Sequence, residues 1–210
     1  MCKPGTRLRV TPTEQRVLDL VREIGIARVR DLTARGLHPE HLRRLVKKGR
    51  LERLNHGVYA LADREISEHH SLVQVAVRAP RSIVCLLSAL QYHEFTTQMP
   101  REVWIAIEQR ERTPAIQSPS IQVVRFSGRA FSEGWTEHKI EQVPVRVFDP
   151  AKTVADCFKF RNTVGMEVAM EALRDCLRDR RATVDELLYF ARVCRVERVM
   201  RPYLEAFQSL

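Results

Sequence analysis

A cluster of basic side chains near the N-terminus has the clearest chemical capability in this sequence. The cluster consists of Arg43, Arg44, Lys47, Lys48, Arg50 and Arg53. Guanidinium and ammonium groups hold phosphate oxygens, and arginine also pairs with guanine through two hydrogen bonds. The cluster therefore predicts binding to nucleic acid. The alternative is a basic face that is only solvated, because runs of charge usually face water.

A second set of reactive side chains, Asp149, Lys152 and Asp156, lies close together in the sequence. Two acids and a lysine can build a metal-dependent nuclease site, but the acids then end a strand and the lysine follows two positions after the second acid. Asp149 is better explained as a helix cap. His69 and His70 are adjacent, so their side chains diverge and do not favour a metal site. We expect no enzyme activity, no cofactor and no metal.

The net charge divides the chain into two parts. The first 62 residues carry 14 lysines and arginines against 6 acids, whereas the remaining 148 carry 21 against 20. Because a basic surface attracts phosphate over long distances, we expect a DNA-binding domain over residues 1–62. The near-neutral second domain, residues 63–210, does not predict a second DNA-binding surface.

Other compositional features indicate a cytosolic protein that does not contact membranes. No segment approaches the roughly 20 apolar residues that span a bilayer, and the N-terminus lacks the apolar core of a signal peptide. The cysteines show no close CxxC spacing, which indicates free and mostly buried thiols. They are Cys2, Cys85, Cys157, Cys176 and Cys194.

Two helices are expected to precede the basic cluster. The segment 11–14 forms a capping box with proline in the first turn, and Gly25 ends this helix. A second short helix is expected over about residues 28–35. Its apolar residues Val29 and Leu32 are expected to face inward.

A third helix is expected to present the basic cluster, between His38 and Gly49. Its apolar residues fall on one face and are Leu42, Leu45 and Val46. Arg44 and Lys47 lie on the opposite face, together with Glu40 and flanked by Arg43 and Lys48. A short helix with an apolar back and a basic front suits the major groove of DNA.

A basic hairpin is expected to follow over residues 51–61. Two short β-prone runs flank the tripeptide at 55–57, Asn-His-Gly, which tolerates the positive φ angles of a tight turn. Two helices, a basic helix and a basic hairpin form the winged helix-turn-helix arrangement.

The basic residues of this domain are expected to play different roles. Arg44 and Lys47 are the best candidates for contacts with base edges. Phosphate contacts are expected from Arg43, Lys48, Arg50 and Arg53. The hairpin residues that could instead reach the minor groove are Arg50, Arg53 and His56. Thr13 and Arg16 could add a contact with the DNA backbone, although simple solvent exposure explains them equally well.

The second domain is expected to be α/β, with a mixed sheet and a helical C-terminal third. Strands are predicted at about 83–86, 102–108, 121–126 and 144–148. Helix starts are predicted at Ser88, Asp149 and Thr183, and Pro202 is expected to interrupt the last helix. The fold class is therefore α+β, with an N-terminal winged helix-turn-helix and a larger C-terminal α/β domain.

Three segments, in this order, resemble the antitoxins of AbiE-type, type IV toxin–antitoxin systems, which are predicted regulators of viral (phage) defence. They are the wing at 49–61, the Ser-Ala-Leu-Gln-Tyr-His segment at 88–93 followed by 101–107, and the segment 148–162. In the last segment we expect a packed helix with Lys152, Lys159 and Arg161 facing solvent. An antitoxin surface is the alternative interpretation of the same residues.

This resemblance implies a transcriptional repressor of its own operon that binds inverted repeats in double-stranded DNA. It also implies an antitoxin domain that counters a nucleotidyltransferase-like toxin without requiring a stable complex. Two alternatives remain open. In the first, the chain is a stand-alone regulator whose C-terminal domain senses a ligand or partner. In the second, it is a DNA-targeted nuclease.

Overall fold

The computed structural model describes residues 10–64, 66–96 and 100–208. Cys2 and three cations of the basic N-terminal part, Lys3, Arg7 and Arg9, lie outside these ranges. The described chain forms two units, and each is treated separately below. The first consists of Met1–His70 with Lys139–Val143, and the second of Ser71–His138 with Pro144–Leu210. A functional division at residue 62 stays a prediction.

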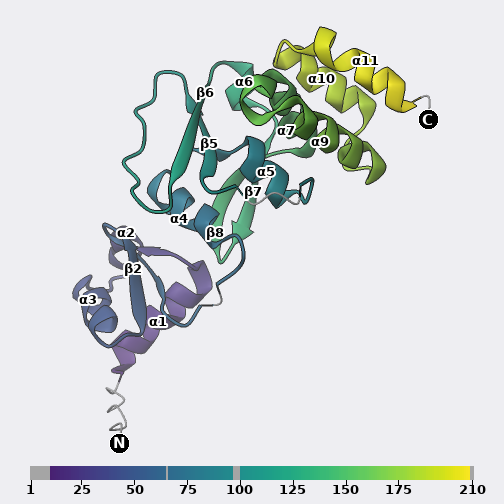
Figure 1. The fold of residues 1–210 in the computed structure, drawn as a ribbon. Coiled ribbons are helices and arrows are strands. Elements are labelled where there is room, and N and C mark those ends of the chain that lie inside the picture. Colours follow the sequence, from purple (N-terminus) through teal and green to yellow (C-terminus); the bar gives the residue numbers. More distant parts are fainter. Residues whose placement is uncertain (1–9, 65, 97–99, 209–210) are drawn as a thin grey trace, which may run out of the picture. The chain divides into compact units, whose positions relative to one another are not determined.

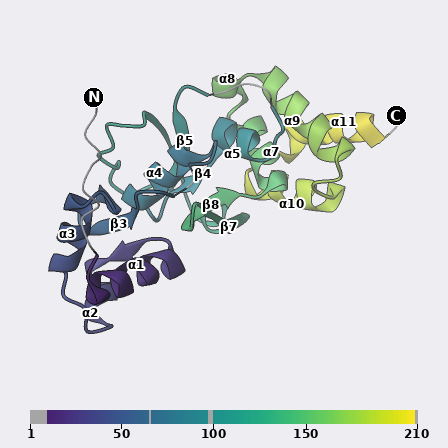
Figure 2. The ribbon, with the colours of Figure 1, turned by 90° about the horizontal axis from the view of Figure 1, so that it is seen from below.

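The first unit contains three helices and a three-stranded sheet of order β1-β3-β2. In chain order the elements are α1 (Pro12–Ile24), β1 (Ala27–Arg28), α2 (Val29–Thr33), α3 (Glu40–Lys47), β2 (Leu51–Asn55) and β3 (Val58–Leu61). Both β1 and β2 pair antiparallel with β3. Helix α1 packs against α3 and β3, and these elements are labelled in Figures 1 and 2. The predicted winged helix-turn-helix is confirmed.

Local sequence signals set the helix ends in this unit. Thr11 caps α1, and the Glu14 carboxylate accepts a hydrogen bond from the Thr11 N–H at 2.7 Å, which completes the capping box. Gly25 closes α1 with φ +73°. The side chain of Leu32 is fully buried, but the expectation for Val29 was wrong because 37% of this residue is exposed. Val29 is the first residue of α2, and its N–H donates to the Gly57 carbonyl.

The second unit contains a five-stranded mixed sheet of order β6-β5-β4-β8-β7. The strands are β4 (Ile83–Val84), β5 (Val103–Glu108), β6 (Ile121–Phe126), β7 (Trp135–Ile140) and β8 (Val143–Phe148). Strand β4 runs antiparallel to β5 and parallel to β8, while β5 and β6 are parallel. The predicted mixed sheet is confirmed, but β1 in the first unit and β7 in the second were not predicted.

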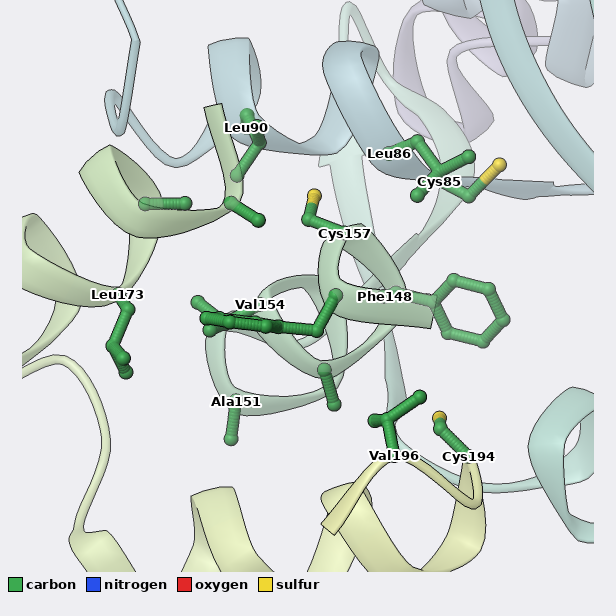
Figure 3. Close-up of a cluster of buried hydrophobic side chains, with 14 of the residues drawn as sticks. Cys85, Leu86, Leu90, Phe148, Ala151, Val154, Cys157, Leu173, Cys194 and Val196 are labelled. Atoms are coloured by element: carbon green, nitrogen blue, oxygen red, sulfur yellow. The ribbon is translucent and has the colours of Figure 1, made fainter. Parts of the chain in front are cut away.

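Eight helices accompany this sheet in the described residues. They are α4 (His70–Arg78), α5 (Leu86–Tyr92), α6 (Arg129–Ser132), α7 (Pro150–Lys159), α8 (Arg161–Val164), α9 (Met166–Arg178), α10 (Val184–Val193) and α11 (Glu197–Gln208). Helix α7 contacts α5, α9, α10 and α11, so it is the central helix of this unit. The close-up in Figure 3 shows its Val154 and Cys157 among side chains of the core.

Three local expectations in the second unit were wrong. Ser88 lies inside α5, where its hydroxyl accepts a hydrogen bond from the Trp104 N–H at 2.9 Å, so it is not a cap. Lys152 is fully buried rather than solvent-facing, and its ammonium group pairs with Asp156. Helix α11 continues through Pro202. In the described residues, no helix is long and apolar enough to cross a membrane.

Candidate nucleic-acid interface

Helix α3 separates its apolar residues from its basic ones. Leu42 and Leu45 are fully buried against the core of the first unit. Arg43, Arg44 and Lys47 are exposed, because they occupy the opposite side of the 3.6-residue helical turn. The helix thus fixes these three cations on one outward face.

The wing holds a further arginine in place. Strands β2 and β3 are joined at His56-Gly57, and the His56 N–H donates to Asn55 Oδ1 at 2.7 Å. The Arg53 guanidinium donates to the Asn55 carbonyl at 3.2 Å and lies 3.0 Å from His56 Nδ1. Because arginine has only donors, His56 Nδ1 accepts this bond. The wing therefore presents Arg53 and His56 as one connected pair.

A groove of about 730 Å³ brings the helix and the wing together. Its basic and imidazole lining comes from both elements and consists of Arg43, Arg44, Lys47, Arg53 and His56. Val29 and the mostly buried Tyr59 add apolar lining. Four cations and a histidine converge here from segments that are separate in the sequence. Such an arrangement suits the polyanionic backbone of a nucleic acid.

The groove cations differ in their existing partners. Among the described residues that line the groove, Glu40 is the one acid, and its carboxylate lies 3.6 Å from Arg43 Nη1. Arg44 and Lys47 have no ion-pair partner within the described ranges. Their charges are therefore the least neutralised of the cations on α3, so they attract the phosphates of a nucleic acid most strongly.

Lys48 does not line the groove, although the sequence predicted that it contacts a phosphate. Its Nζ is 2.8 and 2.7 Å from the two carboxylate oxygens of Glu14, and the exposed fractions of the two side chains are 18% and 3%. The hydrogen bond from Lys48, followed by that from the Thr11 N–H, lowers the pKa of Glu14 below its ordinary value. Lys48 thus joins the end of α3 to the start of α1.

The remaining predicted contacts do not line the groove. Arg50 is exposed in the turn before β2, Arg16 is exposed on α1, and Thr13 is partly buried. Their assignment to DNA contacts stays a prediction. Val29 and Tyr59 were not predicted as lining, because their position depends on the contact between α2, α3 and the wing.

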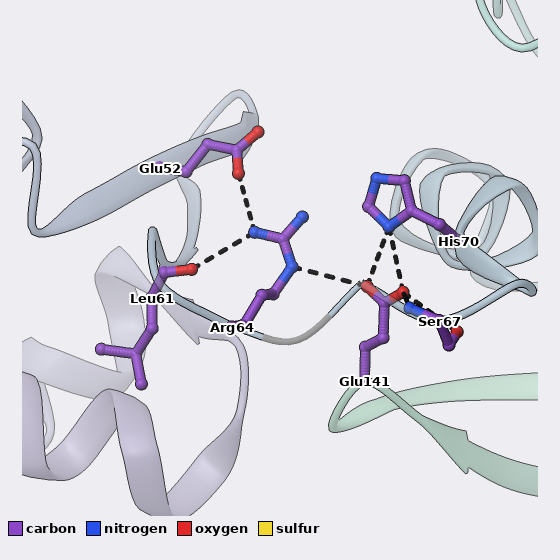
Figure 4. A network of polar contacts seen from close by, with 6 residues as sticks. All are labelled: Glu52, Leu61, Arg64, Ser67, His70 and Glu141. Atoms are coloured by element: carbon purple, nitrogen blue, oxygen red, sulfur yellow. Dashed lines mark hydrogen bonds and ion pairs between the residues drawn. The ribbon is translucent and has the colours of Figure 1, made fainter.

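A polar network on Glu141 was also missed by sequence reasoning (Figure 4). The Glu141 carboxylate accepts hydrogen bonds from the Ser67 N–H at 2.8 Å and the Ser67 hydroxyl at 3.1 Å. It also lies 2.8 Å from His70 Nδ1 and 3.5 Å from Arg64 Nε, and Arg64 reaches Glu52 of β2 at 2.7 Å. All five residues belong to the first unit. Contacts between residues more than 70 positions apart leave no local sequence signal.

Burial and hydrogen bonding act in opposite directions on this carboxyl group. Burial raises the pKa of Glu141, but the hydrogen bonds from Ser67 and His70 outweigh it, so that the pKa is lowered. Glu141 and Gln142 both have positive φ, at 49° and 66°, in the two-residue turn between β7 and β8. Gly25 lies against this turn, since a Cβ atom there would be 1.9 Å from the Gln142 Cβ. The described residues contain no cluster of acids, histidines and cysteines that fits a metal ion.

Comparison with known proteins bears on the part of the chain that carries the groove. Residues 15–62 match the family described as transcriptional regulator, AbiEi antitoxin. The resemblance seen in the sequence is confirmed by this match, which runs from α1 to the end of the wing and supports a general role in transcriptional regulation. Residues 63–210 lie outside the AbiEi match.

A solved structure resembles a larger part of the chain. The crystal structure of the RV2827C protein from Mycobacterium tuberculosis aligns with a TM-score of 0.58 and 16% sequence identity. The alignment covers 87% of this chain and 72% of that chain. At this identity the similarity shows a shared fold alone. A search of curated proteins gave no match.

Proposed function

We propose that this chain binds double-stranded DNA through the groove between α3 and the wing. The observation that carries the proposal is the convergence of Arg44 and Lys47, without acidic partners among the described residues, with Arg53 in one groove. Helix α3 has eight residues, which is a length of about 12 Å and is comparable with the width of the major groove. The AbiEi match covers the same elements.

The geometry favours a division of labour within the groove. Arg44 and Lys47 are outward-facing on α3, so we assign them to base edges. Arg53 is held at the wing by Asn55 and His56, which suits a fixed contact with a phosphate. Arg43 forms an ion pair with Glu40, and we assign it to a phosphate contact.

The regulatory role follows from the family to which residues 15–62 match. We propose that the protein represses its own operon by binding inverted repeats, and that it is the antitoxin of a type IV system in the cytosol. Its functional partner is a nucleotidyltransferase-like toxin of a defence system against phage, and no stable complex with it is required. The second unit is assigned the antitoxin function.

A nuclease role is not favoured by the second unit. Lys152 and Asp156 are fully buried and paired with each other, and the side chain of Asp149 accepts a hydrogen bond from the Thr136 hydroxyl at 2.7 Å. These groups already have partners within the protein. We therefore propose a non-enzymatic regulator, and divalent-metal-dependent cleavage of a plasmid by the purified chain would contradict this.

Binding to the promoter region of the chain's own operon tests the main proposal. Fluorescence anisotropy should show tighter binding to this DNA than to a scrambled duplex. Arg44→Ala and Lys47→Ala should each weaken specific binding by about 1–3 kcal/mol and relax specificity. Arg22→Ala is the matched control, because Arg22 is exposed on α1 outside the groove. Equal losses in all three variants would move recognition elsewhere.

The antitoxin role needs a separate measurement. Cells that express a neighbouring nucleotidyltransferase gene should stop growing, and co-expression of this chain should restore their growth. Arg44→Ala should still restore growth but should no longer repress the operon. Rescue that disappears together with DNA binding would refute the assignment of the antitoxin function to the second unit.

A further inference from the structure

The second unit contains a basic pocket that the proposed DNA-binding role does not use. Its volume is about 730 Å³, and three separate segments line it. These are residues 127–130, which run from the end of β6 into α6, Lys159 at the end of α7, and residues 192–196, which run from the end of α10 to the start of α11. Pockets of 300–1,000 Å³ are typical of sites for small molecules.

The charge of this pocket has one sign. Four of its ten lining residues are cations, and none is acidic: the cations are Arg129, Lys159, Arg192 and Arg195. Over residues 63–210 as a whole, basic and acidic residues nearly cancel. The four cations are therefore a local concentration of charge in a domain that carries almost no net charge. A concave site lined by one sign of charge focuses its field on a ligand of the opposite sign.

Two of the four cations have no carboxylate partner among the residues that the structure describes. Arg129 pairs with Glu133 at 2.7 Å, and Arg192 with Glu197 at 3.3 Å. Lys159 instead lies over the rings of Phe126 and Phe160, at 5.5 and 5.7 Å, and within the described ranges no ion pair involves Arg195. Lys159 and Arg195 thus line a shared pocket without an ion-pair partner among the described residues.

The backbone at Arg195 is specialised. Its φ is +61°, and it occupies the closing position of α10, where the Val196 N–H donates to the Ala191 carbonyl at 2.7 Å. Glycine is the usual residue at such a position, because a side chain there is strained. The chain instead carries an arginine that lines the pocket.

The floor of the pocket is tied to the buried core. Cys194 and Val196 line it and are seen beside the core in Figure 3. Cys194 Sγ donates to Asp156 Oδ1 at 3.2 Å, and Asp156 pairs with Lys152, so the turn after α10 is fixed to α7. A site held in this way keeps its charged groups in place before the ligand arrives, which lowers the cost of binding.

We propose that this pocket binds a small phosphorylated ligand with at least two phosphate charges, of the class of nucleoside polyphosphates. The volume accommodates such a molecule, and Lys159 and Arg195 supply charges that its phosphate oxygens neutralise. Arg129 and Arg192 add donors at the rim. The site lies wholly within the second unit and is independent of the DNA-binding groove.

Calorimetry on the full chain tests the proposal with ATP and pyrophosphate as probes and adenosine as the unphosphorylated control. We expect saturable binding of ATP and pyrophosphate, and none of adenosine. Lys159→Gln and Arg195→Gln should each weaken ATP binding by about tenfold, as expected for a lost charge-assisted hydrogen bond. Arg195→Gly removes the same charge without backbone strain and should behave like Arg195→Gln.

Arg198→Gln is the matched control, since Arg198 is exposed on α11, three residues from Arg195, and does not line the pocket. Its affinity for ATP should stay within about twofold of the parent. Several outcomes would overturn the proposal: no saturable binding of either phosphate probe, equal binding of adenosine, or an equal loss in Arg198→Gln. A parallel loss of operator affinity in the Lys159 and Arg195 variants would assign the pocket to nucleic acid instead.

Discussion

Replacing Lys48 with methionine separates a structural role of this cation from the phosphate contact that its sequence position predicts. Lys48 is adjacent to Lys47, which lines the groove, but its Nζ lies between the two oxygens of Glu14. Methionine keeps the apolar stem and removes the ammonium group. The variant therefore leaves Glu14, whose side chain is 3% exposed, without its counter-charge.

The magnitude follows from the burial of the pair. Removing one partner of a fully buried ion pair costs about 3–5 kcal/mol, whereas an exposed pair contributes about 0–1 kcal/mol. Lys48 is 18% exposed, and Glu14 retains its hydrogen bond from the Thr11 N–H. We expect Lys48→Met to lower the free energy of unfolding of the first unit by about 2 kcal/mol, between these limits.

The assay has to report on the first unit alone. Both tryptophans, Trp104 and Trp135, belong to the second unit. Their fluorescence therefore serves as an internal control that the second unit stays folded. Amide hydrogen exchange in α1 and α3 should give the loss in opening free energy. The pKa of Glu14 is lowered, so the contribution of the pair is present above pH 4.5 and is lost as pH falls through the folded-state pKa.

DNA binding gives the opposing readout. If Lys48 is structural, the slope of log affinity against log salt should not change in Lys48→Met. A lost phosphate contact would reduce the magnitude of this slope by about 0.9. Lys47→Met is the matched control and should weaken DNA binding at unchanged stability. Unchanged hydrogen exchange together with a reduced salt slope in Lys48→Met would refute the reasoning.

Three further predictions concern other contacts. Arg53→Ala should weaken binding to all DNA sequences similarly in anisotropy titrations, and a loss confined to one base pair would show that the wing reads sequence. Glu141→Gln should increase hydrogen exchange at residues 67–70 and lower the free energy of unfolding by about 1–3 kcal/mol at neutral pH. Because the pKa of Glu141 is lowered, this difference from the parent protein should shrink as the pH falls through that pKa. A difference that does not depend on pH would contradict the network. Lys152→Met should lower the free energy of unfolding by about 3–5 kcal/mol, measured by urea unfolding followed by tryptophan fluorescence, and adding Asp156→Leu should recover part of that loss. If the losses of the two single variants add up in the double variant, the two groups do not act as a pair.

The sequence predicted those features of the groove that depend on neighbouring residues. The capping box at Thr11 and Glu14 was predictable because both hydrogen bonds close within one helical turn. The turn at His56-Gly57 was predictable because Gly57 takes a φ of +68°. Helical periodicity then placed Arg44 and Lys47 on the outer face of α3.

Other features depend on what another segment supplies. Lys48 flanks the basic face on a helical wheel, and its pairing depends on Glu14, 34 positions away. Lys152 has the polarity of a surface residue, and it is buried because Asp156 and the ring of Phe148, 3.8 Å from its Nζ, form its surroundings. Val29 is the first residue of α2, and its N–H bonds to Gly57 of the wing, while its side chain is partly exposed. Periodicity within one helix contains no information on these neighbours.

The turn between β7 and β8 has a consequence for how the protein is made. Lys139–Val143 belongs to the first unit, and its Glu141 supplies the carboxylate that Ser67, His70 and Arg64 share. During synthesis from the N-terminus, the winged-helix elements leave the ribosome well before residue 143. Since chains are made at about 5–20 residues per second, several seconds pass between the synthesis of the wing and that of residues 139–143. A nascent chain that stalls before this point carries every residue of the groove but lacks the segment that completes its unit.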